Sequence, residues 1–218
     1  MAIRKENIGL IDKAAEAIGK KYSDGLKMCE LGNQYVKDDP NFKTAKEYFT
    51  SLGVNHTSID TNGEDGAIKV DLSIISKEHQ NEFDIVTNYG TSEHVKQQYE
   101  VFANIHNWTN VGGAMVHCLP QAGYWYYHGK FNYELAFFTR LAECSGYKFV
   151  SCESVKKLDG QAYMDSIYNG PKRPPMELPT EQYNCGAILI KQDAKPFMHR
   201  SEFYRMGGLV LTGKGDVV

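Results

Sequence analysis

The residues that could do chemistry in this chain stand where buried strands are expected to end. Residues 28–34, Met-Cys-Glu-Leu-Gly-Asn-Gln, run from apolar residues into Glu30, then to Gly32 and a polar pair. This order is typical of a strand that stops abruptly in a loop. A carboxylate followed by glycine at such a point lies beside a backbone that a nucleotide-like ligand can approach closely.

Two further carboxylates close the next expected strands. Asp60 follows the expected strand 54–59, and Asp71 follows the short expected strand 67–70. Taken alone, Glu30 is explained equally well as a carboxylate that accepts hydrogen bonds from nearby backbone, and Asp60 is better explained as an ordinary strand-end residue. Their positions at consecutive strand ends favour a shared ligand site, because the carboxyl ends of parallel strands meet at one edge of a sheet.

Two histidines are candidates for proton transfer. His94 follows the compact apolar run 83–87, where it is explained equally well as a solvated residue in the first turn of a helix. His128 ends the aromatic run Tyr124-Trp125-Tyr126-Tyr127. The ordinary pKa of histidine suits it to act as a general base toward a hydroxyl. Tyr124, Trp125 and Tyr127 are candidates for the wall of a substrate site, or alternatively pack into the core and against a partner subunit. Residues with metal-ligand spacing are not found along the sequence, so we expect no metal site.

Strands and helices alternate along the chain, which favours a mostly parallel sheet with helices on both faces. Two final strands without a helix between them predict an antiparallel hairpin at one edge. A helix start is expected at Asp39-Pro40, with Ala45, Phe49 and Leu52 on its inner face. The expected helices cover 5–22, 39–52, 93–106 and 131–145, and the expected strands cover 26–31, 54–59, 67–70, 83–87, 114–119, 147–155 and 186–192.

Composition narrows the functional class. The chain has 218 residues, 42% hydrophobic and 23% charged, with a net charge of −3. This charge disfavours nucleic acid as a partner. No segment has the roughly 20 apolar residues of a membrane span, and the first 20 residues lack a secretion signal. With five cysteines and no Cys-x-x-Cys pair, we expect a cytoplasmic protein. Its oligomeric state is not indicated.

The segment Gly90-Thr91-Ser92-Glu93-His94-Val95, together with the acidic strand ends and the final hairpin, resembles the class I S-adenosylmethionine-dependent methyltransferases. In detail it is similar to a group of small bacterial methyltransferase-like proteins with a Gly-Thr-x-Glu-His-Val segment. The resemblance implies a single Rossmann-like domain with a seven-stranded sheet. Its parts would be an N-terminal helix (1–25), the core (26–192) and a C-terminal tail (193–218).

The resemblance also implies roles for individual residues. Glu30, Gly32 and Asn33 would support the methionine part of the cofactor, and Asp60 would accept hydrogen bonds from the ribose hydroxyls. Asp71 and Leu72 would contact the adenine. The floor nearest the sulfonium would be lined by the following residues: Asn88, Gly90, Glu93 and His94. The implied product of the cofactor is S-adenosylhomocysteine.

Three functions remain open at this point. Methyltransferases that act on amino groups of nucleic acids carry an Asn/Asp-Pro-Pro-aromatic sequence after the fourth strand. This chain has Asn88-Tyr89-Gly90-Thr91 there, so a small molecule is the expected acceptor. Asn33 and Gln34 replace the usual loop glycines and Tyr35 adds a bulky ring, which keeps open a non-catalytic nucleoside-binding or scaffolding protein. A nicotinamide-dependent oxidoreductase is disfavoured, because only Gly32 of its Gly-x-Gly-x-x-Gly pattern is present.

Overall fold

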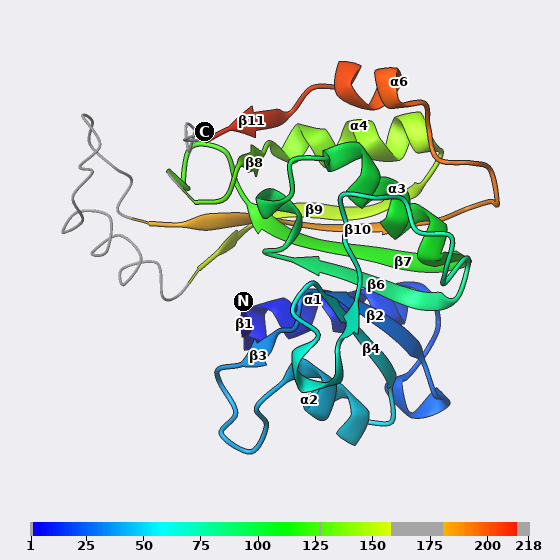
Figure 1. The fold of residues 1–218 in the computed structure, drawn as a ribbon, viewed down its shortest axis with the longest axis vertical. Coiled ribbons are helices and arrows are strands. Elements are labelled where there is room, and N and C mark those ends of the chain that lie inside the picture. Colours follow the sequence, from blue (N-terminus) through cyan, green and yellow to red (C-terminus); the bar gives the residue numbers. More distant parts are fainter. Residues whose placement is uncertain (1, 127, 158–180, 213–218) are drawn as a thin grey trace.

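The computed structural model describes residues 2–126, 128–157 and 181–212 (Figure 1). Its centre is a seven-stranded sheet in the order β5-β4-β2-β6-β7-β10-β9. The strands in this order are β5 (Ile68–Lys69), β4 (Asn55–Asp60), β2 (Lys27–Leu31), β6 (Phe83–Tyr89), β7 (Thr109–Pro120), β10 (Tyr183–Ile190) and β9 (Lys148–Lys156).

Strand pairing confirms the predicted fold. Strands β5, β4, β2, β6 and β7 pair in parallel, whereas β10 pairs antiparallel with both β7 and β9. The central strand β6 is buried along its whole length, as expected for a strand that is covered on both faces. The carboxyl ends of β2, β4 and β6 therefore meet at one edge of the sheet.

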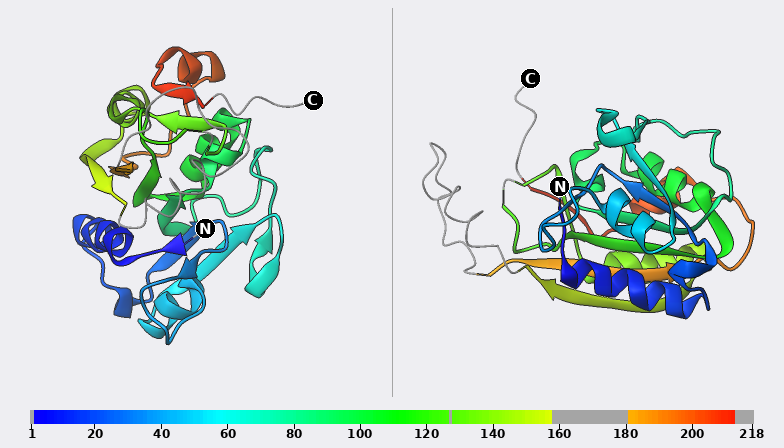
Figure 2. Two further views of the ribbon diagram at one scale, coloured as in Figure 1. Left: turned by 90° about the vertical axis from the view of Figure 1, so that its left-hand side faces the viewer. Right: turned by 90° about the horizontal axis from the view of Figure 1, so that it is seen from below.

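Helices cover both faces of this sheet (Figures 1 and 2). On one face, α1 (Lys5–Ala17) and α2 (Ala45–Ser51) share an apolar cluster with inward residues such as Met28 and Ile85. On the other face, α3 (Gln98–Trp108), α4 (Leu135–Ser145) and α6 (Arg200–Arg205) pack on a second cluster that includes Val86 and Met115. None of the described helices is long and apolar enough to cross a membrane.

Short elements complete the fold. Three 3-10 turns are present in the described chain: η1 (Tyr22–Asp24), η2 (Glu64–Gly66) and η3 (Ser92–His94). β1 (Ala2–Ile3) pairs in parallel with β3 (Tyr35–Val36), and β8 (Phe131–Tyr133) pairs antiparallel with β11 (Leu209–Leu211). The segment after β10, in which no helix or strand was predicted, thus returns to the body of the domain through α6 and β11.

Several predicted helix boundaries are wrong. The first helix ends at Ala17, before Tyr22, and α2 begins at Ala45 because Thr44 caps it. The Thr44 hydroxyl accepts from the Glu47 N–H, and the Glu47 carboxylate accepts from the Thr44 N–H, so both ends of this capping box are satisfied. Leu52 is 40% exposed and does not belong to the inner face.

The predicted helices at 93–106 and 131–145 also begin too early. η3 and a turn precede α3, which starts at Gln98, and β8 occupies the residues expected to open α4. In the second case the pairing of β8 with β11 explains the difference, since a distant strand satisfies the backbone.

Candidate functional site

The loop after β2 holds the first predicted site residues. Gly32 has φ +82°, a conformation that favours glycine, and its N–H donates to the Ile59 carbonyl at 2.7 Å. Glu30 lies below this loop, with only 1% of its surface exposed. Its Oε1 accepts from the Gln34 N–H at 3.2 Å and from the Ser58 hydroxyl at 3.1 Å. The structure therefore places Glu30 as a support for the loop backbone, away from any open surface.

Glu30 shares its buried site with His56. The His56 Nε2 lies 3.8 Å from Glu30 Oε2, and neither atom has a hydrogen-bond partner among the described residues. Burial raises the pKa of Glu30 to about 8, against hydrogen bonds from Gln34 and Ser58 that act to lower it. Burial lowers the pKa of His56 to about 3. Near neutral pH both groups are therefore mostly uncharged, and the loop rests on a protonated carboxyl.

Asp60 stands at the end of β4, beside the same loop. Its Oδ2 accepts from the Asn33 N–H at 2.8 Å, and its Oδ1 accepts from the Asn62 N–H at 3.1 Å. Burial acts to raise the pKa of Asp60, but these hydrogen bonds more than offset it, so the pKa lies below its ordinary value. Asp60 is therefore an ionised, half-buried carboxylate that retains an acceptor position on Oδ2.

Other contacts hold the Asn33 side chain. Its amide nitrogen donates to Asp65 Oδ2 at 2.9 Å, and Asp65 in turn pairs with Lys43. The loop after β2 is thus tied to the loop after β4. These ties lie beside the position where the resemblance implies the ribose.

Asp71 and Leu72 follow β5 at the edge of the sheet and differ in exposure. Asp71 is exposed, and hydrogen bonds from Ser73 lower its pKa. Leu72 is 6% exposed and belongs to the apolar core cluster with Ile59. Asp71 remains accessible to a ligand, whereas the Leu72 side chain packs inward.

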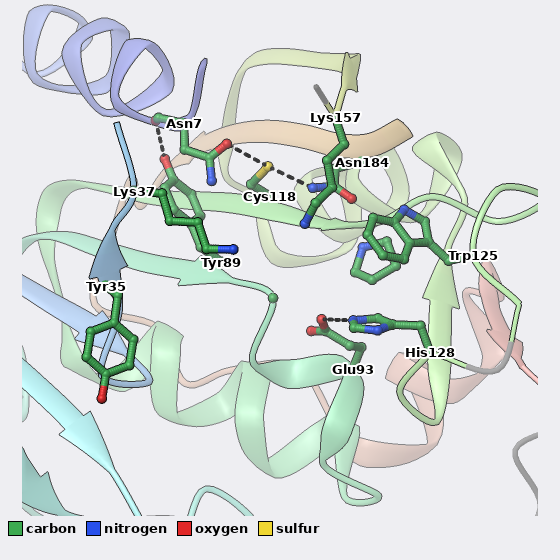
Figure 3. A pocket seen from close by; sticks show the side chains of 12 residues that line it. Asn7, Tyr35, Lys37, Tyr89, Glu93, Cys118, Trp125, His128, Lys157 and Asn184 are labelled. Atoms are coloured by element: carbon green, nitrogen blue, oxygen red, sulfur yellow. Dashed lines mark hydrogen bonds and ion pairs between the residues drawn. The ribbon is translucent and has the colours of Figure 1, made fainter. Parts of the chain in front are cut away.

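A pocket of about 400 Å³ opens at the carboxyl ends of β6 and β7 (Figure 3). Residues from α1, β3, β6, β7 and β10 converge on it with the loop that precedes β8. Its lining comprises Asn7, Tyr35, Lys37, Tyr89, Gly90, Glu93, Cys118, Pro120, Trp125, His128, Lys157 and Asn184. Of the predicted site residues, the structure brings Gly90, Glu93, Trp125 and His128 to this pocket. Glu30, Asp60 and Asp71 lie at neighbouring strand ends, outside its lining.

Asn88 points away from the pocket, on the other face of β6. Its amide nitrogen donates to the Ser92 hydroxyl at 3.0 Å and lies 3.4 Å from His117 Nδ1. The Ser92 hydroxyl also contacts the Tyr133 hydroxyl at 2.8 Å, and Tyr133 donates to Gln98 Oε1 at 2.7 Å. This buried network fixes the segment between β6 and α3. The Asn88 side chain therefore acts on the shape of the site, while Gly90 provides backbone at its surface.

Glu93 projects from that segment into the pocket (Figure 3). It is completely buried, and neither carboxylate oxygen has a hydrogen-bond partner among the described residues. His128 Nε2 lies 3.5 Å from Glu93 Oε1, and His94 Nε2 lies 3.7 Å from the same oxygen. The two imidazole rings meet edge to face, with centroids 5.1 Å apart. The two histidines predicted for catalysis are therefore brought together around a buried carboxylate.

Backbone packing fixes this arrangement. The Lys130 N–H donates to the Glu93 carbonyl at 2.6 Å. Gly129 has φ +63°, and a Cβ there would lie 2.8 Å from Glu93 Cγ, closer than real Cβ contacts allow. Gly129 thus lets the loop of His128 dock directly on Glu93.

The aromatic run is split between pocket and surface. Trp125 is buried, its indole N–H donates to the Tyr183 carbonyl at 2.8 Å, and its ring lies 4.7 Å from that of His128. Tyr124 is half-buried and packs on Tyr183, outside the pocket lining. Tyr127 lies outside the described residues. Trp125 alone of the three predicted substrate residues is placed at the pocket by the described structure.

Several lining residues were missed from the sequence. Asn7 comes from α1, and its carbonyl accepts from the Tyr89 hydroxyl at 2.9 Å. Lys37 follows β3, and the Lys157 ammonium lies 5.0 Å from the centre of the Trp125 ring. No motif or spacing marks these positions, because they reach the pocket from elements far apart in the chain.

Comparison with known proteins rests on structure, since no protein-family model and no curated sequence matches the chain. One similar solved structure is the Burkholderia thailandensis 1,6-didemethyltoxoflavin-N1-methyltransferase, with bound 1,6-didemethyltoxoflavin and S-adenosylhomocysteine. It has a TM-score of 0.55 and 11% identity over 87% of this chain and 79% of that one. Another is the Haemonchus contortus phosphoethanolamine N-methyltransferase 2 in complex with S-adenosyl-L-methionine. It has a TM-score of 0.53 and 12% identity over 86% of this chain and 52% of that one.

The fold is that of the class I methyltransferases. The same fold also carries another reaction, since the [4+2]-cyclase SpnF matches with a TM-score of 0.55 and 13% identity, over 84% of this chain and 80% of that one. A methyltransferase fold therefore does not by itself determine the reaction.

The residues at the strand ends fit S-adenosylmethionine in part. Asp60 is an ionised carboxylate with acceptor capacity, and Gly32 and Gly90 leave the backbone of two neighbouring strand ends without a Cβ. Against this, Asn33 already donates to Asp60 and Tyr35 lines the pocket. Asp60 thus has the acceptor capacity that a ribose diol requires, while Tyr35 occupies part of the wall of the neighbouring pocket.

Proposed function

We propose that this protein is an S-adenosylmethionine-dependent methyltransferase that acts on a small molecule in the cytoplasm. The observation that carries the proposal is the ionised Asp60 beside Gly32, at strand ends next to a pocket. A carboxylate with this placement can accept hydrogen bonds from two ribose hydroxyls. When bound, the cofactor supplies a methyl group on a positively charged sulfur.

Each part of the site has a role in this proposal. Asp60 binds the ribose, Asp71 accepts from the adenine amino group, and the backbone of Gly32, Asn33 and Gly90 follows the rest of the cofactor. In the pocket, Trp125 forms an apolar wall that aligns the acceptor and excludes water. His128 and His94 lie where a proton would leave a hydroxyl or amine acceptor, held there by the Gly129–Glu93 packing.

The acceptor class follows from the pocket. Its volume of about 400 Å³ suits a small molecule, and apolar and aromatic walls alternate with Glu93, Lys37 and Lys157. The Burkholderia neighbour, which was solved with such an acceptor, supports this choice. Nucleic acid and membrane are not part of the proposal.

A second candidate function is a nucleoside-binding protein without transfer activity. The contacts from Asn33 to Asp60 and Asp65, together with the Tyr35 ring at the pocket, favour it, because they occupy space beside the expected cofactor. Under this alternative, nucleosides bind and no acceptor is methylated.

Calorimetric titration with S-adenosylmethionine, S-adenosylhomocysteine and NAD in parallel tests the proposal. We expect both sulfur nucleosides to bind, with no binding of NAD. Asp60→Asn should weaken S-adenosylhomocysteine by roughly 10- to 100-fold, because charged hydrogen bonds contribute about 1.5–3 kcal/mol each. Asp193→Asn is the matched control, since Asp193 follows the far end of β10. Absence of binding, or equal affinity of wild type and Asp60→Asn, would refute the assignment.

A further inference from the structure

Glu93 is a fully buried carboxyl group, and neither of its oxygens has a hydrogen-bond partner among the described residues. A bare carboxylate in such a place costs several kcal/mol unless a cation or proton accompanies it. Two imidazole nitrogens lie near Glu93 Oε1, His128 Nε2 at 3.5 Å and His94 Nε2 at 3.7 Å. Both distances are beyond ordinary hydrogen-bond length. The carboxylate therefore lacks a close partner at the position where two nitrogen ligands converge.

We propose that Glu93, His94 and His128 form a binding site for a divalent transition-metal ion at the wall of the pocket. Each residue offers one ligand atom, and the three atoms all lie within 4.8 Å of one another. An ion held about 2.0–2.2 Å from each atom brings such atoms to roughly 3.0–3.6 Å apart. The Glu93–His128 and Glu93–His94 separations are already close to this range. The two imidazole nitrogens, which lie at most 4.8 Å apart, would approach each other by about 1 Å when the ion binds.

The chemistry of the three ligands selects the ion. One carboxylate and two imidazoles suit Zn²⁺, Mn²⁺, Fe²⁺ or Co²⁺, whereas Mg²⁺ prefers oxygen ligands. Three protein ligands leave further coordination positions. In Figure 3 the Glu93 carboxylate and the His128 ring face the cavity, with Trp125 beside them. The remaining positions therefore open toward the pocket, where an oxygen or nitrogen atom of a small molecule would coordinate.

The surrounding structure holds the ligands in place. Gly129 and Lys130 dock the His128 loop on the Glu93 backbone, and the Thr91 hydroxyl donates to the Leu31 carbonyl at 2.7 Å. The Gln98 amide donates to the carbonyls of Ser92 and Val95, on either side of the Glu93–His94 pair. The three candidate ligands thus stand on a backbone fixed by buried contacts, as a metal site requires.

Spacing along the sequence predicted no metal site, because the three ligands are not arranged in one segment. Two ligands are adjacent in the chain and the third comes from a distant loop, so their arrangement exists only in the folded protein. It also changes the role of the histidines. A nitrogen that coordinates an ion is not available as a base, so the histidines would act through the metal.

Metal binding by the purified, chelator-treated protein tests the proposal without cofactor or acceptor. Calorimetry with Zn²⁺ and Mn²⁺, and visible absorption with Co²⁺, should show one site, with Mg²⁺ binding more weakly. Glu93→Gln keeps the shape of the side chain and His128→Ala removes one ligand. Each should weaken Zn²⁺ at least about tenfold. His199→Ala removes an exposed histidine at the start of α6 and should leave the affinity unchanged.

Two outcomes would overturn the inference: no binding of Zn²⁺, Mn²⁺ or Co²⁺ by the wild type, or equal affinity in wild type, Glu93→Gln and His128→Ala. Thermal unfolding of each variant shows whether it is folded, and the isosteric Glu93→Gln provides the test if His128→Ala unfolds. Titration with S-adenosylhomocysteine on the same samples is read separately. Failure of metal binding with retained nucleoside binding would refute this inference and leave the proposed function intact.

Discussion

Burial raises the pKa of Glu30 from 4.5 to about 8, so the free energy of unfolding should depend on pH by a predictable amount. The folded protein keeps the proton on Glu30 through a range of pH in which the unfolded chain has lost it. This stabilising contribution is fully present below about pH 4.5 and is lost as the pH rises through about 8. Within that window each pH unit changes the free energy of unfolding by about 1.4 kcal/mol.

Glu30→Gln removes this dependence while preserving the acceptor for the Gln34 N–H and the Ser58 hydroxyl. Relative to wild type, the variant should therefore gain stability with rising pH. Between about pH 5 and about pH 7.5 the difference in unfolding free energy should grow by about 3 kcal/mol. Urea denaturation of both proteins at several pH values in this range measures it.

Buried histidines do not obscure the comparison. Burial lowers the pKa of His56 and His117 to about 3 and of His106 to about 4. Each of these depressed values makes stability increase with pH up to about 6.5, in wild type and variant alike, so the effect cancels in the difference. A difference that stays constant across pH would refute the reasoning. It would mean that Glu30 is ionised in the folded protein and paired with a protonated His56.

Two further substitutions test the packing of the pocket. Gly129→Ala should cost at least about 2 kcal/mol of unfolding free energy and weaken Zn²⁺ binding, because the new Cβ would meet Glu93. Gly146 has a similar positive φ with open space around it, so Gly146→Ala should cost about 1 kcal/mol without affecting Zn²⁺. Equal losses in the two alanine variants would contradict the docking role of Gly129. Tyr133→Phe removes the hydroxyl that contacts Ser92 and Gln98 and should lower the unfolding free energy by about 1–3 kcal/mol in urea denaturation; unchanged stability would show that this network does not support the segment before α3.

Much of the fold could be predicted from the sequence, because local patterns determine it. The apolar run that became β6 and the glycine after Leu31 mark strands and their ends without knowledge of distant partners. The order of strands and helices then implied a parallel sheet with a terminal antiparallel hairpin. The starts of α3 and α4 were missed, since they depend on contacts with residues remote in sequence, such as Ser92 with Tyr133 and β8 with β11.

The candidate site, like the fold, could be predicted from the sequence only in part. Asp60 and Gly32 could be named from their positions at strand ends. The Glu93 cluster could not, because His128 reaches it only when Gly129 packs against the Glu93 backbone. Asn88 and Leu72 were found at the predicted strand ends, but their side chains face inward, a direction that residue type alone does not determine.

The strand β11 has a kinetic consequence for this pocket. Through Leu209–Leu211 it pairs with β8, while Thr212 donates to the carbonyls of Gly129 and Lys130. The loop of His128 is therefore held between the Glu93 segment, which precedes it in the chain, and the much later segment at Thr212. Contacts over such sequence separations form slowly compared with local ones. During refolding, helical circular dichroism should recover before ligand binding does, so the pocket matures last.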